Sequence, residues 1–125
     1  MPITGLYTLN DFQYPEKDAV LAKIKLNGQH EIFKGHFPGR PVLPGVCLLN
    51  IITDLLTEAT KEKQFLKSAD FVKFINLVQP EINTYIYVQL SKISETEEGL
   101  KLEASAFFEN TVFLKFKGVF GKLIL

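Results

Sequence analysis

The sequence lacks several features that identify whole classes of protein. It contains one cysteine, Cys47, so no disulfide can form within the chain, and the apolar neighbours of Cys47 predict a small buried side chain in a reducing compartment. Lys plus Arg total 14 and Asp plus Glu total 14, and no basic cluster stands out, which argues against a nucleic-acid binder. No stretch approaches the roughly 18 apolar residues of a membrane span, and residues 1–4 do not resemble a signal peptide. We therefore expect a cytoplasmic protein that binds neither nucleic acid nor membrane.

The sequence also shows no linker, no internal repeat and no low-complexity tract. Its 125 residues, 46% of them hydrophobic, are enough for one well-packed core and too few for two. We expect a single domain over residues 1–125.

Period-two alternation of apolar and polar residues dominates the chain. Such alternation is typical of half-buried strands, and it predicts them over residues 20–26, 72–78, 86–90, 100–108 and 112–120. Pro80 is expected to end the second of these, and Gly99 and Asn110 lie where hairpins would turn, so the last three strands predict an antiparallel meander. Phe107 and Phe113 are expected on the second face of the sheet.

One segment has helical spacing instead. Pro44 is a plausible first helical residue, and a helix is expected from Gly45 to about Lys61. Its polar residues form one narrow stripe, at Asn50, Thr53, Asp54, Thr57 and Glu58. A helix that is apolar on its other sides must be covered by other structure. We expect an α+β fold in which a long antiparallel sheet of five or six strands wraps one central helix, with the polar stripe as an ordinary solvated face or as part of a site.

Residues 35–46 combine a histidine with a stiff loop and a helix start. Prolines fix the backbone around His36, whose ordinary pKa of about 6.5 suits proton transfer at neutral pH. The backbone N–H groups of Gly45 and Val46 then open the helix, where unpaired donors and the helix dipole can stabilise an oxyanion. An ordinary turn around a histidine is the alternative interpretation.

The same segment is similar, almost letter for letter, to the active-site signature of the β-hydroxyacyl-acyl carrier protein dehydratases, over Phe33-Lys34-Gly35-His36-Phe37-Pro38-Gly39-Arg40-Pro41-Val42-Leu43-Pro44-Gly45-Val46. A weaker similarity covers residues 70–74 and 78–80. The resemblance implies a hotdog fold, dimers or higher homo-oligomers with two sites at the dimer interface, and an acyl chain carried on acyl carrier protein or coenzyme A.

The resemblance also implies a role for each matched residue. His36 would remove the proton next to the thioester carbonyl, and the N–H of Gly45, with that of Val46, would stabilise the enolate. Phe37, Pro38 and Phe74 would line the acyl tunnel. No metal and no other cofactor is needed, because elimination of water requires only an acid, a base and an oxyanion site.

The sequence departs from the family at its second catalytic position. The family carries Glu or Asp fourteen residues after the histidine, where this chain has Asn50, and an amide cannot donate a proton to a leaving hydroxyl. Three hypotheses follow. The chain is a dehydratase in which Asp54, about 6 Å from Asn50 on the same helix face, supplies the acid. It completes its site by pairing with a hotdog paralogue that keeps the carboxylate. Or it is a thioesterase using Asp54 or Glu58, or a non-catalytic subunit that binds acyl chains or their carrier.

Overall fold

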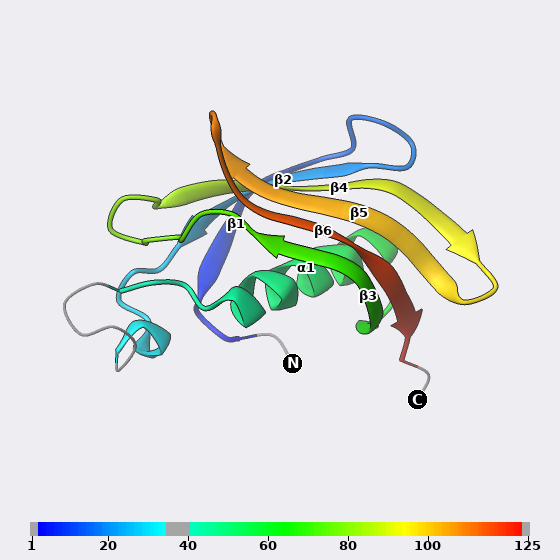
Figure 1. Cartoon of the computed structure of the whole chain (residues 1–125), viewed down its shortest axis with the longest axis horizontal. Coiled ribbons are helices and arrows are strands. Elements are labelled where there is room, and N and C mark those ends of the chain that lie inside the picture. The colour runs from blue at the N-terminus through cyan, green and yellow to red at the C-terminus, as the bar shows by residue number, and fades with distance from the viewer. Residues whose placement is uncertain (1–2, 35–40, 124–125) are drawn as a thin grey trace.

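The computed structural model describes residues 3–34 and 41–123. Six strands and one long helix account for most of them (Figure 1), with a short 3₁₀ helix between the second strand and the helix. The elements are β1 (Tyr7–Gln13), β2 (Val20–Leu26), η1 (Glu31–Phe33), α1 (Gly45–Thr60), β3 (Gln64–Phe74), β4 (Tyr85–Thr96), β5 (Gly99–Phe108) and β6 (Thr111–Lys122).

All six strands form one antiparallel sheet in the order β1-β2-β4-β5-β6-β3. The meander expected for the last three strands is confirmed, and its two hairpins turn beside Gly99 and at Asn110. Gly99 has a φ of 136°, and a Cβ there would lie 2.3 Å from the carbonyl oxygen of Phe120. Only glycine fits this turn.

Helix α1 lies against the concave face of the sheet, which curls around it (Figure 1). The predicted alternation is confirmed in β2, β4 and β5, whose inward residues are buried, namely Val20, Ala22, Ile24, Leu26, Ile86, Val88, Leu90, Leu102, Ala104 and Ala106. They pack against the apolar side of the helix, made by Cys47, Leu48, Ile51, Ile52, Leu55 and Leu56. Cys47 is buried, as its neighbours predicted. The arrangement is the α+β architecture expected from the sequence, a sheet wrapped around one helix.

The strand predicted over residues 72–78 is wrong in position. The observed β3 starts eight residues earlier, at Gln64, and ends at Phe74, so Val78 lies outside it. Two register shifts against β6 interrupt the alternation of β3, and most of its side chains are exposed because it is an edge strand. A strand with neither a steady period nor a buried face gives little signal in the sequence.

Irregular register also explains two smaller differences. A shift between Leu9 and Asp11 breaks the pattern of β1, the strand that had no predicted position. Phe113, expected on the second face, is instead buried in the core, because it is an extra residue between the pairs Ala106–Leu114 and Phe107–Val112. Bulges of this kind turn a side chain to the other face. Among the described residues, no helix is long and apolar enough to cross a membrane.

Candidate functional site

The N-terminal end of α1 presents the backbone that was predicted to bind an oxyanion. The helix begins at Gly45, and Pro44 is its N-cap in an extended conformation, so the prediction that Pro44 is the first helical residue is wrong by one position. The N–H of Cys47 donates to the Pro44 carbonyl at 2.9 Å. The N–H groups of Gly45 and Val46 are in the first turn, where a helix provides no acceptor of its own and its dipole favours negative charge. Both groups therefore suit the predicted role.

An apolar cavity of about 320 Å³ borders this end of the helix. Its lining comes from the segment before α1, the first turn of α1 and the end of β3 with the residues after it, namely Leu43, Gly45, Val46, Leu48, Phe74, Asn76, Leu77 and Val78. The ring of Phe74 packs directly against Gly45. A Cβ on Gly45 would lie only 2.6 Å from Cζ of that ring. The glycine is thus needed for a phenylalanine ring to approach the helix backbone, and Val46, 70% exposed, forms the outer rim.

The predicted base and two predicted lining residues lie outside the described residues. His36, Phe37 and Pro38 belong to residues 35–40, so their roles remain predictions.

A second hollow, of about 400 Å³, follows the polar stripe of α1 further along the helix. The stripe supplies Asn50, Thr53, Asp54, Thr57 and Glu58, edge strand β1 supplies Tyr7 and Leu9, and Lys63 and Gln64 close the far end. We call this hollow the polar pocket. Asn50 and Asp54 both line it, so a carboxyl and an amide share the same space. All of the stripe except Glu58 is half-buried, which distinguishes it from an ordinary solvated face.

Asp54 is held by a contact between the helix and the sheet edge. The hydroxyl of Tyr7 donates a hydrogen bond to Oδ2 of Asp54 at 3.3 Å. Burial raises the pKa of Asp54 above its ordinary value, while the hydrogen bond from Tyr7 acts in the opposite direction. Burial, and then the neighbouring Asp54 carboxylate, raise the pKa of the Tyr7 hydroxyl. A carboxyl that keeps its proton to higher pH suits a general acid.

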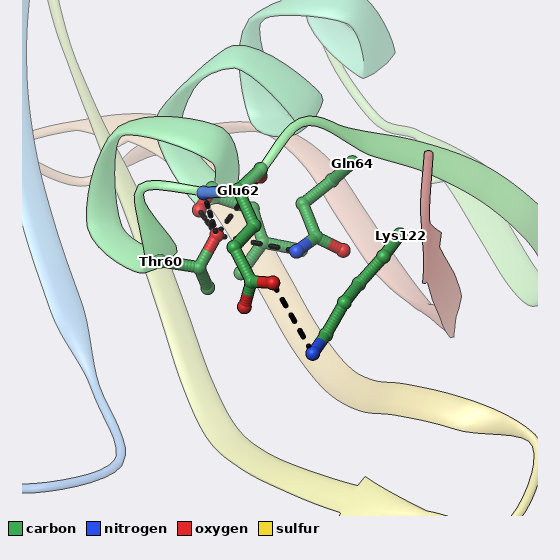
Figure 2. A network of polar contacts seen from close by, with 5 residues as sticks. Thr60, Glu62, Gln64 and Lys122 are labelled. Atoms are coloured by element: carbon green, nitrogen blue, oxygen red, sulfur yellow. Dashed lines mark hydrogen bonds and ion pairs between the residues drawn. The ribbon is translucent and has the colours of Figure 1, made fainter. Parts of the chain in front are cut away.

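The far end of the polar pocket is fixed by hydrogen bonds at the junction of α1 and β3 (Figure 2). Oγ1 of Thr60 donates to the Leu56 carbonyl and accepts from the Glu62 N–H and from Nε2 of Gln64. An ion pair of 3.2 Å between Glu62 and Lys122 ties the junction to the end of β6. Lys61 ends the helix with a positive φ of 60°. These contacts fix the short connection between the end of α1 at Thr60 and the start of β3 at Gln64.

Gln64 is the buried polar residue at this junction. The residue is 5% exposed, and among residues 3–34 and 41–123 its Oε1 has no hydrogen-bond partner, whereas its amide nitrogen donates to Thr60. Neither Gln64 nor Tyr7 was predicted as part of the site. Tyr7 lies on β1, whose register shift removes the alternation that would have predicted the strand. Gln64 lies in a charged stretch after the helix, where the sequence gives no sign of burial. No group of three or more His, Cys, Asp or Glu that could hold a metal ion occurs within residues 3–34 and 41–123.

Comparison with known proteins relates this arrangement to one family. The model of the ApeI-like family, described as ApeI dehydratase, matches residues 13–117. The 3-hydroxyacyl-[acyl-carrier-protein] dehydratase FabZ of Lactobacillus helveticus is 33% identical over 110 residues, which cover 82% of this chain and 73% of that enzyme. The enzyme of the same name from Rickettsia felis is 35% identical over 68 residues, and this match spans 47% of its length, so the chain aligns with about half of that relative.

Solved structures show the same fold. A chain of the dehydratase heterocomplex ApeI:P from Xenorhabdus doucetiae superposes with a TM-score of 0.77 at 18% identity, covering 92% of this chain and 97% of that one. An uncharacterized protein from Erwinia carotovora superposes with a TM-score of 0.67 at 19% identity, covering 93% and 94%. The hotdog fold implied by the sequence is confirmed.

Proposed function

This chain belongs to the ApeI-like dehydratase family, and from that premise we propose that it removes water from a (3R)-3-hydroxyacyl thioester carried on acyl carrier protein, in fatty-acid or related acyl-chain synthesis. One observation carries the proposal. The polar pocket contains a carboxyl, Asp54, beside the amide of Asn50, and burial raises the pKa of that carboxyl. The acid that the family motif lacks here is thus available one helical turn further on.

The reaction then uses a base, an oxyanion site, an acid and an amide. His36 removes the proton from the carbon next to the thioester carbonyl, and the electron pair moves toward the carbonyl oxygen. The N–H groups of Gly45 and Val46 hold the enolate oxygen that develops. The carbon–oxygen bond at the next carbon breaks as the double bond forms, and Asp54 gives its proton to the departing hydroxyl, which leaves as water. Asn50 holds that hydroxyl by hydrogen bonding. Phe37, Pro38 and Phe74 line the tunnel that holds the acyl chain. A proton passes from His36 to Asp54 through solvent before the next turnover.

The geometry of α1 supports a site built from two chains. Gly45 and Asp54 are nine residues apart, which is about 13 Å along a helix. The carbonyl and the departing hydroxyl of one substrate lie only a few ångströms apart, so one substrate cannot contact both Gly45 and Asp54 of the same helix. In a dimer, the first turn of one chain can meet the polar pocket of the other. Edge strand β3, which pairs only with β6 among the described strands and exposes Phe65, Phe71 and Phe74, offers a surface for this pairing.

The direct test is the rate of enoyl formation from a 3-hydroxyacyl carrier-protein substrate and from its coenzyme A analogue. We expect His36→Ala and Asp54→Asn each to lose about 10²–10⁴-fold, because each removes one proton-transfer group. Glu58→Gln is the matched control, since Glu58 lies on the same stripe but is exposed and ion-paired with Lys61 at 2.9 Å. An Asp54→Asn variant as fast as the wild type contradicts the assignment of the acid. Release of free thiol in place of enoyl product identifies a thioesterase.

A second candidate is a half-site completed by a different chain. The solved relative with a TM-score of 0.77 is described as a heterocomplex, and Asn50 leaves this chain without the family acid. Here the chain contributes His36 and the oxyanion donors, and a hotdog paralogue contributes a helix carboxylate. Native mass spectrometry after co-expression with such a paralogue distinguishes the two candidates. A homodimer that ignores the paralogue contradicts the heterodimer, and a heterodimer that alone forms enoyl product contradicts the self-contained enzyme.

A further inference from the structure

Tyr7 connects the sheet edge to Asp54, the half-buried carboxyl of the polar pocket. Tyr7 is the first residue of β1 and lies 47 positions before Asp54 in the sequence. Its hydroxyl donates a hydrogen bond to Oδ2 of Asp54 at 3.3 Å. We propose that Tyr7 is a positioning residue for Asp54, holding one carboxyl oxygen so that the other is available to the substrate. The inference rests on the proposed function, in which Asp54 is the general acid, and extends it to a residue outside the family motif.

The surroundings of Asp54 give this hydrogen bond its importance. The polar and charged residues that line the pocket with Asp54 are Tyr7 from β1, Asn50, Thr53, Thr57 and Glu58 from α1, and Lys63 and Gln64 from the junction with β3. The three ion pairs found among residues 3–34 and 41–123 join Lys61 to Glu58, Lys92 to Glu103, and Lys122 to Glu62, and Asp54 takes part in none of them. Within that part of the chain, the hydrogen bond from Tyr7 is the contact that orients the carboxyl.

A tyrosine suits this task better than a charged partner. A lysine or arginine beside Asp54 would strongly favour the ionised carboxylate and remove the proton that an acid must donate. The neutral hydroxyl orients the carboxyl at a smaller cost, and the raised pKa of Tyr7 keeps it a donor throughout the working pH range. At 3.3 Å the bond is long for a hydroxyl donor, as catalytic hydrogen bonds often are before substrate binds.

A purely structural role is the competing explanation. In that case the hydrogen bond only fastens β1 to α1, and its loss lowers stability without changing the titration of the acid. The two explanations differ in the pH profile of the reaction. The hydrogen bond favours the ionised form of Asp54, so its removal raises the pKa of Asp54 and moves the alkaline limb of the profile to higher pH.

The experiment compares Tyr7→Phe with the wild type, and uses Tyr14→Phe as the matched control because Tyr14 is exposed on the loop after β1. Two measurements are made on the 125-residue chain. The first gives kcat and KM for dehydration against pH, and the second gives the pKa of Asp54 from carboxyl carbon NMR, with Asp54→Asn for assignment. We expect Tyr7→Phe to lower kcat by about 10- to 100-fold with little change in KM, since a misplaced catalytic group costs up to about 10²-fold. The alkaline limb and the NMR pKa should both move upward, and Tyr14→Phe should change neither.

Each other outcome refutes the hydrogen-bonded pair, the positioning role or the proposed function. An unchanged NMR pKa of Asp54 in Tyr7→Phe refutes the pairing itself. A raised pKa with wild-type kcat, or lower thermal stability with an unmoved alkaline limb, refutes the positioning role. A wild type that forms no enoyl product while the NMR pKa still moves refutes the proposed function and leaves the Tyr7–Asp54 pair standing.

Discussion

The two ends of α1 border hollows of opposite character. At the first turn, the described residues that line the cavity beside Gly45 and Phe74 include no titratable group. Two turns further on, the polar pocket contains Asp54, Glu58, Lys63 and Tyr7. The first suits a carbonyl and an apolar chain, whereas the second contains a carboxyl that can give a proton. In the proposed mechanism, substrate binding and acid catalysis are therefore separated along one helix, and two chains must combine to bring them together.

The largest effect expected from this comparison is a rescue. Asp54→Asn should lose about 10²–10⁴-fold in dehydration, and adding Asn50→Glu to that variant should restore at least about tenfold, because the family places its carboxylate there. Single-turnover formation of enoyl product measures both. A double variant as slow as Asp54→Asn contradicts the idea that the two positions serve one reaction centre.

The apolar end can be tested by its packing. Gly45→Ala places a methyl group against the Phe74 ring, so we expect a loss of about 1–3 kcal/mol in the free energy of unfolding. The same change in a Phe74→Ala background should cost much less, since the ring is gone. Urea denaturation of the four proteins gives the coupling. Equal costs in both backgrounds would show that the ring is not what requires glycine.

The polar end should make stability depend on pH. Burial raises the pKa of Asp54, so the folded chain holds this proton more tightly than the unfolded chain does. The contribution of Asp54 to wild-type stability therefore falls as the pH rises from the usual carboxyl range, near about 4, through the folded pKa of Asp54. Asp54→Asn removes this loss, and its stability relative to wild type should increase with pH across that window. Thr53→Val, a change in the same pocket without a titratable group, should show a constant difference. A difference for Asp54→Asn that is constant or shrinks with pH contradicts the raised pKa.

The smallest effect concerns Gln64. Gln64→Met removes an oxygen that has no hydrogen-bond partner in the described part of the chain, and burial of such an oxygen costs about 1–3 kcal/mol. It also removes one hydrogen bond to Thr60, worth about 0.5–1.5 kcal/mol. We expect stability to stay the same or rise by about 1 kcal/mol in thermal or urea unfolding. A clear loss would mean that Oε1 acquires a partner when the protein assembles.

The sequence predicted the regular parts of this molecule better than the irregular ones. Strands such as β2, with Ala22 and Ile24 facing the helix, follow a strict period because one face is buried. Edge strands β1 and β3 carry register shifts and exposed faces, so their positions could not be read from periodicity. The apolar end of the site was anticipated because Gly45 belongs to a dense motif. Tyr7 was not, since a contact across 47 positions leaves no local pattern.

The most direct test of the central claim is the activity of the chain purified alone, without any hotdog paralogue. If Asp54 supplies the acid, the isolated chain converts a 3-hydroxyacyl carrier-protein thioester to the enoyl product. Asp54→Asn then abolishes most of that rate. An isolated chain that folds and pairs but forms no enoyl product, and gains activity only when a carboxylate-bearing partner is added, would contradict the claim.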